Sequence, residues 1–291
     1  MLPRRVVTGS LADTSVPSVA TLSPRVTLVL GANPGWFTGP GTNTYLVGTG
    51  SRPVLIDTGQ GMPEYRELLR HTRESVRPCE GLRAVALTHG HFDHMGGVGD
   101  VLAEFGPVPV YKMPDAADPA TLALEPLEEG SVVSAEGATL RVLWTPGHAR
   151  DHVCFFLEEE KALFTGDVVL GAGTTVIPED GDLAAYLRSL QRLLELDARI
   201  LYPGHGPPVE NPARKIREYL AHRELRERQI LDALADGALS VAELVAAIYT
   251  DVPAVLHQAA GWSVRAHLRK LEAEGRVRRE QERWQRLREN A

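Results

Sequence analysis

The sequence predicts an α/β protein in which two sheets pack as a sandwich and a smaller helical module follows. Short apolar segments of strand length recur between loops that are rich in glycine, proline and asparagine. Several of these segments end at a glycine-flanked histidine or aspartate, which would gather polar side chains along one edge of the sandwich. From residue 211 onward, apolar residues instead recur at helical spacing. We therefore divide the chain into a catalytic part, residues 1–210, and a C-terminal module, residues 211–291.

The first predicted strands are short and apolar, and they lead to one helix. A loop rich in glycine, proline and asparagine, residues 31–41, separates the first two strands, and residues 48–52 join the next two as a hairpin. The predicted strands span residues 25–30, 42–47, 53–56 and 82–87, and the helix spans residues 64–72.

The second half of the catalytic part continues in the same way. Residues 113–130 are acidic and irregular and are predicted to form a surface loop, and residues 158–160 form a hairpin turn. Cys154 lies in an apolar strand, so we expect it to be a core residue. The predicted strands span residues 108–111, 139–144, 152–157, 161–165 and 198–202.

The segment from Thr88 to Gly97 reads Thr-His-Gly-His-Phe-Asp-His-Met-Gly-Gly and directly follows a buried strand. Imidazole and carboxylate groups are ligands that divalent ions such as zinc accept. Because alternate residues of a tight turn can point to two sides, we expect His89 and His91 to face one metal. Asp93 and His94 would face a second metal beside it. The alternative is a polar surface loop, but it leaves half of the ten histidines of the chain unexplained.

Four further strands end in a similar manner, at Asp57, His148, Asp167 and His205. Glycine neighbours allow the tight backbone that a metal site needs. An acid at the end of an apolar strand is costly unless it is paired or hydrogen-bonded. Asp57 is therefore predicted to orient a ligand histidine, and the alternative is a simple turn-forming aspartate before Gly59.

Together these residues provide seven candidate ligands, which exceeds the number that one tetrahedral zinc ion takes and suits two ions with a bridging ligand. A carboxylate has two oxygens, so Asp167 is the natural bridge. Such a pair of ions would lower the pKa of a shared water toward about 7 and supply a hydroxide for hydrolysis. No serine or cysteine nucleophile is evident. One ion would take His89, His91 and His148, and the other would take Asp93, His94 and His205.

The motif from Thr88 to His94 resembles the signature of the metallo-β-lactamase superfamily, and the other pieces stand in the family's order, with Asp57 before the motif and His148, Asp167 and His205 after it. This resemblance implies a four-layer αββα sandwich and two bound Zn²⁺ ions, with Mn²⁺ or Fe²⁺ as alternatives. It also implies that Asp167 bridges the ions. True zinc β-lactamases have a cysteine at that position, so we do not expect antibiotic hydrolysis. The pattern is closer to the glyoxalase II and RNA-processing branches.

A narrower resemblance, to an endoribonuclease subgroup of this superfamily, covers nearly the whole chain. It implies zinc-dependent cleavage of single-stranded RNA, and we assign the catalytic aspartates as Asp93 and Asp57. Hydrolysis of a small thioester or lactone, as in glyoxalase II, is the alternative, and a metal-free RNA-binding or regulatory module is disfavoured by the seven ligands. Gly90 and Phe92 depart from the subgroup. The matching segments are residues 33–35, 41–50, 55–59, 165–176 and 202–207.

The C-terminal module is predicted to be a winged helix, which this subgroup also carries. Residues 212–235, 241–249 and 264–273 have helical spacing, Ser240 with Glu243 has the form of a capping box, and residues 276–279 with 282–284 suit a two-stranded wing. Basic residues here could contact phosphates, although a packing or dimerisation role is favoured slightly. These residues are Arg265, His267, Arg269, Lys270, Arg276, Arg278 and Arg279.

Charge is unevenly distributed between the two parts. Residues 211–291 hold 15 Lys and Arg against 12 Asp and Glu, a net charge of +3, whereas residues 1–210 hold 16 against 26, a net charge of −10. An acidic catalytic part disfavours a broad nucleic-acid footprint there. This balance favours the small-molecule alternative, while the whole-chain resemblance favours RNA.

The remaining composition indicates an enzyme of a reducing compartment. Two cysteines are too few for a disulfide framework, and no apolar run approaches the ~18 residues of a membrane span. Residues 1–20 show no signal peptide and are predicted to be a frayed tail. We expect a cytoplasmic protein, or a mitochondrial matrix protein if it comes from an animal, with RNA or a small ester as its partner and a homodimer as an option.

Overall fold

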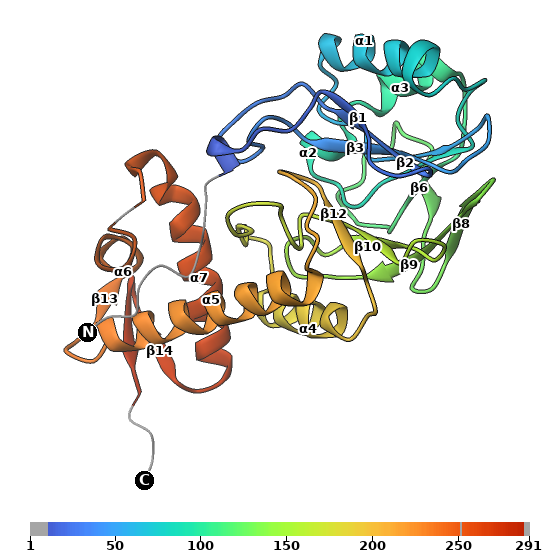
Figure 1. Cartoon of the computed structure of the whole chain (residues 1–291). Coiled ribbons are helices and arrows are strands. Elements are labelled where there is room, and N and C mark those ends of the chain that lie inside the picture. The colour runs from blue at the N-terminus through green and yellow to red at the C-terminus, as the bar shows by residue number, and fades with distance from the viewer. Residues whose placement is uncertain (1–10, 251, 288–291) are drawn as a thin grey trace.

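The computed structural model describes residues 11–250 and 252–287. The first sheet has seven strands in sequence order, and Figure 1 shows it in the upper part of the molecule. The first four strands pair antiparallel and the last four pair parallel. They are β1 (Val19–Thr21), β2 (Val26–Leu30), β3 (Asn43–Val47), β4 (Val54–Ile56), β5 (Ala84–Ala86), β6 (Val110–Lys112) and β7 (Glu125–Pro126).

The second sheet has five strands in the order β12-β11-β10-β9-β8. Only the pair of β11 and β12 is parallel, because α4 (Leu183–Leu194) lies between these two strands in the sequence. Every residue of β10 and β11 is buried, as expected for strands covered on both faces. The strands are β8 (Val132–Ala135), β9 (Ala138–Trp144), β10 (Val153–Leu157), β11 (Ala162–Gly166) and β12 (Ile200–Pro203).

The two sheets pack face to face and helices cover both outer faces, so the αββα prediction is confirmed (Figure 1). The rings of Tyr45, Phe164 and Tyr202 pack between the sheets in edge-on and tilted arrangements, with centroids 5.1–5.6 Å apart. Burial of each such side chain contributes roughly 1.5–3 kcal/mol. On the outer faces, α1 (Pro63–His71) and α3 (Val98–Phe105) cover the first sheet, and α4 with α5 (Pro212–Ala233) covers the second.

Several elements of the catalytic part differ from the prediction. Helix α4 was not predicted, although its buried residues recur at helical spacing and the Asp182 side chain caps its N-terminus by accepting a hydrogen bond from the Ala185 N–H at 2.9 Å. The short strands β1 and β8 were also missed, and so was β7, which forms within the predicted surface loop 113–130 and pairs with β6. The frayed tail is wrong from residue 11 onward, where a 3-10 helix (Leu11–Asp13) and β1 form, and residues 1–10 lie outside the described part.

The C-terminal module is a winged helix, as predicted. The capping box between Ser240 and Glu243 is present at the start of α6, and the third helix begins at residue 257, earlier than the predicted residue 264. Helix α5 joins the two parts, because its first half packs with α4 and its last turns pack in the winged-helix core. The elements after α5 are β13 (Leu239–Ser240), α6 (Val241–Ile248), a 3-10 helix (Ala254–Leu256), α7 (His257–Ala273), β14 (Val277–Glu280) and β15 (Arg283–Arg286).

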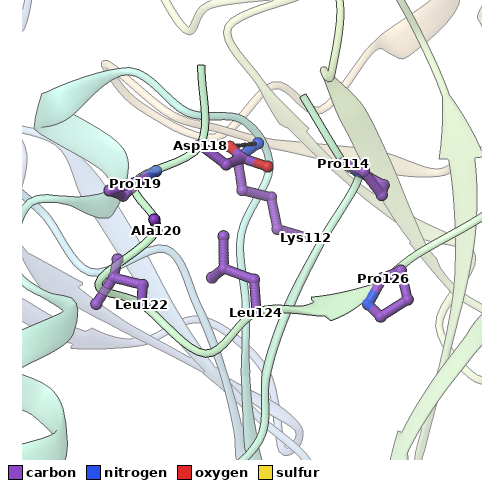
Figure 2. A pocket seen from close by; sticks show the side chains of 8 residues that line it. All are labelled: Lys112, Pro114, Asp118, Pro119, Ala120, Leu122, Leu124 and Pro126. Carbon is purple, nitrogen blue, oxygen red and sulfur yellow. Dashed lines mark ion pairs between the residues drawn. The ribbon is translucent and has the colours of Figure 1, made fainter. Parts of the chain in front are cut away.

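A cavity of about 240 Å³ lies beside β6, at the segment predicted to be a surface loop. Figure 2 shows its mostly apolar wall, with Lys112 and Asp118 at one end. The buried Lys112 ammonium lies 2.5 Å from Asp118 and 2.6 Å from Asp151. Gly90, which lies in the histidine-rich turn, packs against this ion pair, since a Cβ there would lie 3.2 Å from both Lys112 and Asp151.

Among the described helices, none is long and apolar enough to cross a bilayer.

Candidate metal centre

The strand ends bring the predicted site residues together at one edge of the sandwich. Residues 57 and 88–94 follow β4 and β5 of the first sheet, while His148, Asp167 and His205 follow β9, β11 and β12 of the second. Residues 92–95 form one short helix, α2 (Phe92–Met95), where the sequence predicted only a turn. A backbone bridge between Thr42 and His205 joins the two sheets at this edge.

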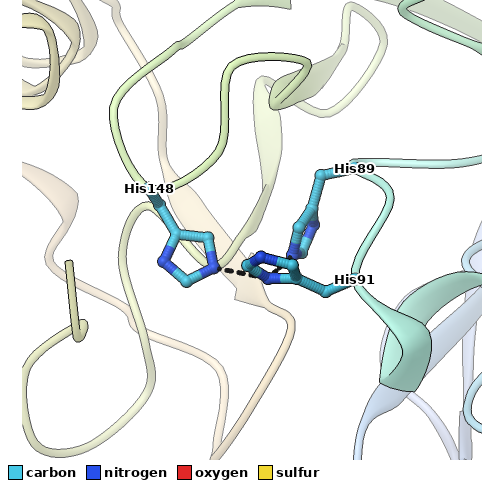
Figure 3. Close-up of side chains that lie close together, drawn as sticks. All are labelled: His89, His91 and His148. Carbon is cyan, nitrogen blue, oxygen red and sulfur yellow. Dashed lines mark hydrogen bonds between the residues drawn. The ribbon is translucent and has the colours of Figure 1, made fainter. Parts of the chain in front are cut away.

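Three histidines form the first cluster (Figure 3). His91 Nδ1 lies 2.9 Å from His89 Nε2 and 3.0 Å from His148 Nε2. Their outer contacts fix two tautomers. His148 Nδ1 must donate to the Val176 carbonyl at 2.9 Å. His89 Nδ1 donates to the Thr88 hydroxyl, which itself donates to Asp57.

Two lone pairs, on His89 Nε2 and His148 Nε2, therefore converge on one atom, His91 Nδ1. A single N–H there can satisfy only one of them. A cation between the three nitrogens would satisfy all of them, and tetrahedral ligands at 2.0–2.1 Å from zinc stand about 3.3 Å apart, close to the spacing seen here. The first cluster therefore fits a metal ion.

Asp93, His94 and His205 form the second cluster. His205 Nε2 lies 3.2 Å from Asp93 Oδ2, and His94 Nε2 lies 3.5 Å from the same oxygen. All three side chains offer ligand atoms within 4.8 Å of one another. One carboxylate and two imidazoles are a donor set that suits zinc, iron or manganese.

Asp167 lies between the two clusters. Its Oδ1 atom is 3.4 Å from both His94 Nε2 and His205 Nε2, while its Oδ2 atom is 3.6 Å from His148 Nε2. Within the described residues, Asp167 Oδ1 and His94 Nε2 are buried and have no hydrogen-bond partner. Buried polar atoms without a partner are costly, and a bound cation would remove that cost.

Asp57 lies behind His94 and orients it. Asp57 Oδ2 accepts a hydrogen bond from His94 Nδ1 at 2.8 Å, and Oδ1 accepts one from the Thr88 N–H at 2.8 Å. The residue is buried and has a φ of 56°, so it also makes the turn before Gly59. Both roles considered for Asp57 are thus present, and its carboxylate turns His94 Nε2 toward the second cluster.

His152, which the sequence predicted only as the first residue of a strand, lies beside this centre. Its buried ring lies 4.9 Å from the ring of His89, and its Nε2 atom accepts a hydrogen bond from the Asp167 N–H at 3.0 Å. Burial holds the pKa of His152 well below its usual range, which keeps Nε2 free to accept. The available signal was a second histidine four residues after His148.

The pKa values of the buried histidines are shifted downward in the first cluster and upward in the second. Burial lowers the pKa of His89, and it lowers the pKa of His148 to about 4, so both are neutral. Burial also acts against protonation of His205 and His94, but the charges of Asp167 and Asp93 outweigh it. The pKa of His205 rises to about 9, and that of His94 also rises well above its usual range. Burial acts to raise the pKa of Asp93, but His94 and His205 lower it to about 2.

The glycines of the motif allow the turn to pack closely. A Cβ on Gly97 would lie 2.1 Å from the Thr58 carbonyl oxygen, whereas a Cβ on Gly99, in α3, meets no described atom within 4 Å. We expect Gly97→Ala to lower the free energy of unfolding by about 3 kcal/mol through overpacking. Gly99→Ala should raise it by about 0.5–1 kcal/mol. Urea unfolding measures both, and equal stability of the two variants would contradict the packing argument.

The basic residues of the C-terminal module are mostly engaged within the chain. His267 is buried, Arg265 is half-buried, and Arg269 donates to the Gly181 carbonyl at 3.0 Å. Each of the others has an acidic neighbour, so this surface is not a continuous basic patch. The pairs are Lys270 with Glu227 and Glu274, Arg276 with Glu227, Arg278 with Glu280, and Arg279 with Glu282.

Curated relatives match most of the chain. A protein of Aspergillus fumigatus named atrochrysone carboxyl ACP thioesterase is 42% identical over 256 residues, covering 82% of this chain and 78% of the relative. A protein of Caenorhabditis elegans named β-lactamase-like protein 2 homolog is 39% identical over 269 residues, covering 91% of this chain and 90% of the relative.

Solved structures and family models give the same assignment. A metallo-β-lactamase family protein of Thermus thermophilus has a TM-score of 0.77 at 27% identity, and the match covers 92% of this chain and 100% of that chain. The model of the β-lactamase-associated winged helix domain matches residues 240–284. The model of the metallo-β-lactamase superfamily matches residues 37–205, which hold every candidate ligand. This chain therefore belongs to the metallo-β-lactamase superfamily and is a hydrolase of that family with a C-terminal winged helix.

Proposed function

We propose that this hydrolase works with a dinuclear metal centre, most naturally two Zn²⁺ ions, with Mn²⁺ or Fe²⁺ as alternatives. The observation that carries this proposal is the position of Asp167, whose two carboxylate oxygens face different clusters. The proposed ligands are His89, His91 and His148 for one ion, Asp93, His94 and His205 for the other, and Asp167 between them.

The surrounding residues would prepare this centre for hydrolysis. When bound, two ions would supply a hydroxide at neutral pH and would stabilise negative charge that develops during attack. Asp57 and Val176 fix the tautomers of His94 and His148, so that each ring presents Nε2 to its cluster. His152 holds the backbone of Asp167. These contacts fix the ligands before substrate arrives, and the same arrangement serves attack on phosphorus or on a carbonyl carbon.

Single-stranded RNA is the first proposed substrate. The resemblance to an endoribonuclease subgroup that the sequence motifs indicate covers nearly the whole chain, and the relative named β-lactamase-like protein 2 homolog matches 91% of it. Phe92, between two proposed ligands, is 66% exposed, and Trp36 and Phe37 are 56% and 52% exposed at the tip of a hairpin closed between Gly35 and Gly39. Exposed aromatic rings offer surfaces on which unpaired bases stack.

A thioester is the second proposed substrate, and two specific observations favour it. The catalytic part carries a net charge of −10, and the basic residues of the winged helix are largely paired with acids, which weakens any phosphate footprint. In addition, one relative at 42% identity is named as a thioesterase. The exposed aromatic residues would then contact an acyl group instead of bases.

A paired assay on zinc-loaded protein separates the two substrates. One arm uses a labelled single-stranded RNA, the other a lactoyl-glutathione-type thioester and an acyl-carrier-protein thioester. Zinc-dependent RNA cleavage that Asp93→Ala abolishes would support RNA as the substrate. Thioester turnover while the RNA stays intact would instead support the thioester. Hydrolysis by protein stripped of metal would contradict the dinuclear mechanism itself.

A further inference from the structure

The loop from residue 168 to residue 177 connects the two sides of the metal centre. It begins directly after Asp167, and its Val176 carbonyl accepts the hydrogen bond from His148 Nδ1 at 2.9 Å. The neighbouring Thr175 hydroxyl donates to the Asp167 carbonyl at 2.7 Å. A shift of the Thr175–Val176 peptide would therefore move the partner of one proposed ligand and the backbone contact of another.

Helices α4 and α5 hold this loop from its outer side. The Tyr186 hydroxyl of α4 donates to the Val168 carbonyl at 2.7 Å, and the Leu170 N–H donates to the Tyr219 hydroxyl of α5 at 2.9 Å. The third contact comes from Arg223, one turn further along α5, whose Nη2 donates to the Thr175 carbonyl. Its guanidinium also stacks over the ring of Tyr186 at 5.2 Å.

Burial of the Arg223 guanidinium costs free energy unless hydrogen bonds replace its lost hydration. Only 2% of its surface is exposed, and its Nε has no hydrogen-bond partner within the described residues. A guanidinium in such a position loses hydration that few contacts replace. The nearby His222 adds no second charge, since burial and the charges of Arg223 and Arg226 lower its pKa to about 3. Among the described residues, the Thr175 carbonyl is the backbone group to which the Arg223 guanidinium donates a hydrogen bond.

We propose that Arg223 is a positioning residue for the metal centre. Arg223 fixes the Thr175 carbonyl, one peptide group before the Val176 carbonyl, and so restrains the acceptor that sets the tautomer and direction of His148. Through the Thr175 hydroxyl it also supports the backbone of Asp167. Helix α5 also packs in the winged-helix core, so the C-terminal module contributes to the ligand geometry of the catalytic part. This inference rests on the proposed metal centre.

The test compares three variants of the full chain with the wild type. Arg223→Met removes the donor and keeps an unbranched side chain, while Arg223→Lys keeps a charge and one donor group. Arg226→Met is the matched control, because Arg226 lies one turn further along the same helix. Within the described residues, its guanidinium contacts Gln229 of the same helix and, on the winged-helix side, the Ile248 carbonyl and the ring of Tyr249.

Two measurements on each protein are needed. Zinc affinity is measured by competition with a chromophoric chelator, and hydrogen–deuterium exchange of residues 168–177 is measured on metal-free protein. We expect Arg223→Met to bind zinc about 10–100-fold more weakly, with faster exchange in this loop. Arg223→Lys should recover part of both losses, and Arg226→Met should match the wild type. If Arg223→Met does not fold, Arg223→Lys should still show a smaller loss in the same direction.

The outcomes separate this inference from the proposed function. A wild type that binds no metal would remove the dinuclear proposal and the ligand role with it, yet the exchange data on metal-free protein would still report whether Arg223 holds the loop. Suppose instead that the wild type binds two ions, and that Arg223→Met and Arg223→Lys change neither the zinc affinity nor the loop exchange. This result would overturn the inference about Arg223 and leave the proposed function standing. Equal losses in Arg226→Met would also overturn it, because they would indicate general loosening of α5.

Discussion

Replacement of Asp93 by alanine is expected to lower kcat/KM by on the order of 10³-fold or more while leaving the fold in place. Asp93 offers the only carboxylate of the second cluster, and its Oδ2 lies 3.2 Å from His205 Nε2. Loss of this proposed ligand should empty or displace one ion. The charge stabilisation that a metal supplies is worth several kcal/mol, and each 1.36 kcal/mol is tenfold in rate.

Metal content and activity should be measured together for this variant. We expect about one equivalent of zinc to be lost, with a circular dichroism spectrum like that of the wild type. Asp197→Ala is a suitable control, because Asp197 is a surface aspartate paired with Lys161. It lies before the start of β12, whereas the metal centre lies beyond the other end of that strand, where His205 follows. Full activity of Asp93→Ala at wild-type zinc content would show that Asp93 is not a ligand.

The strand-end pattern of the sequence was sufficient to predict the architecture of this edge. The residues after β4, β5, β9, β11 and β12 converge there because parallel and sandwiched strands deliver their carboxyl ends to a common side. Helix α4 could also have been found, since Leu183, Tyr186, Leu190 and Leu193 recur at helical spacing. Short edge strands are harder to predict. Strand β1 has three residues, none of them fully buried, and so gives no alternation of apolar and polar residues to detect.

The supporting contacts of the site could not be predicted in the same way. His152 looks like any polar residue before an apolar strand, and only the fold shows that it accepts from the Asp167 N–H. Lys112 is likewise a single lysine after a short strand until the loop carrying Asp118 and the turn carrying Asp151 pack on it. The partners lie 6 residues apart for Lys112 and Asp118 and 15 apart for His152 and Asp167, so no single spacing rule identifies these contacts, and only the packing of strands and loops brings their atoms together.

The charge pattern of the C-terminal module illustrates the opposite problem. Composition identifies the basic residues but not their partners, and the fold pairs Lys270 and Arg276 with the same acid, Glu227 of α5. A net charge of +3 for residues 211–291 therefore overstates the positive surface that a phosphate would meet. Exposed pairs on the wing are individually weak, at about 0–1 kcal/mol, so a polyanion could still compete for them.

The affinity for zinc is expected to rise steeply with pH between about 6.5 and 9. In metal-free protein the acidic neighbours raise the pKa of His205 to about 9, so this ring is a cation with both nitrogens protonated at neutral pH, and they shift the pKa of His94 in the same direction, well above its usual range. Zinc binds only the neutral imidazole, so binding must release these protons. Each released proton makes the association constant rise about tenfold per pH unit, which gives up to about 100-fold per unit for two.

The stability of the metal-free protein should change in the opposite direction. The pKa of His205 is raised in the folded state, so its pairing with Asp167 and Asp93 stabilises the protein fully below about pH 6.5, the ordinary histidine pKa, and is lost as the pH rises through about 9. Zinc titrations in weakly buffered solution with an indicator dye would count the protons directly. If no protons are released at pH 7.5, these histidines are neutral before the metal binds. The difference in histidine protonation between the two clusters would then be wrong.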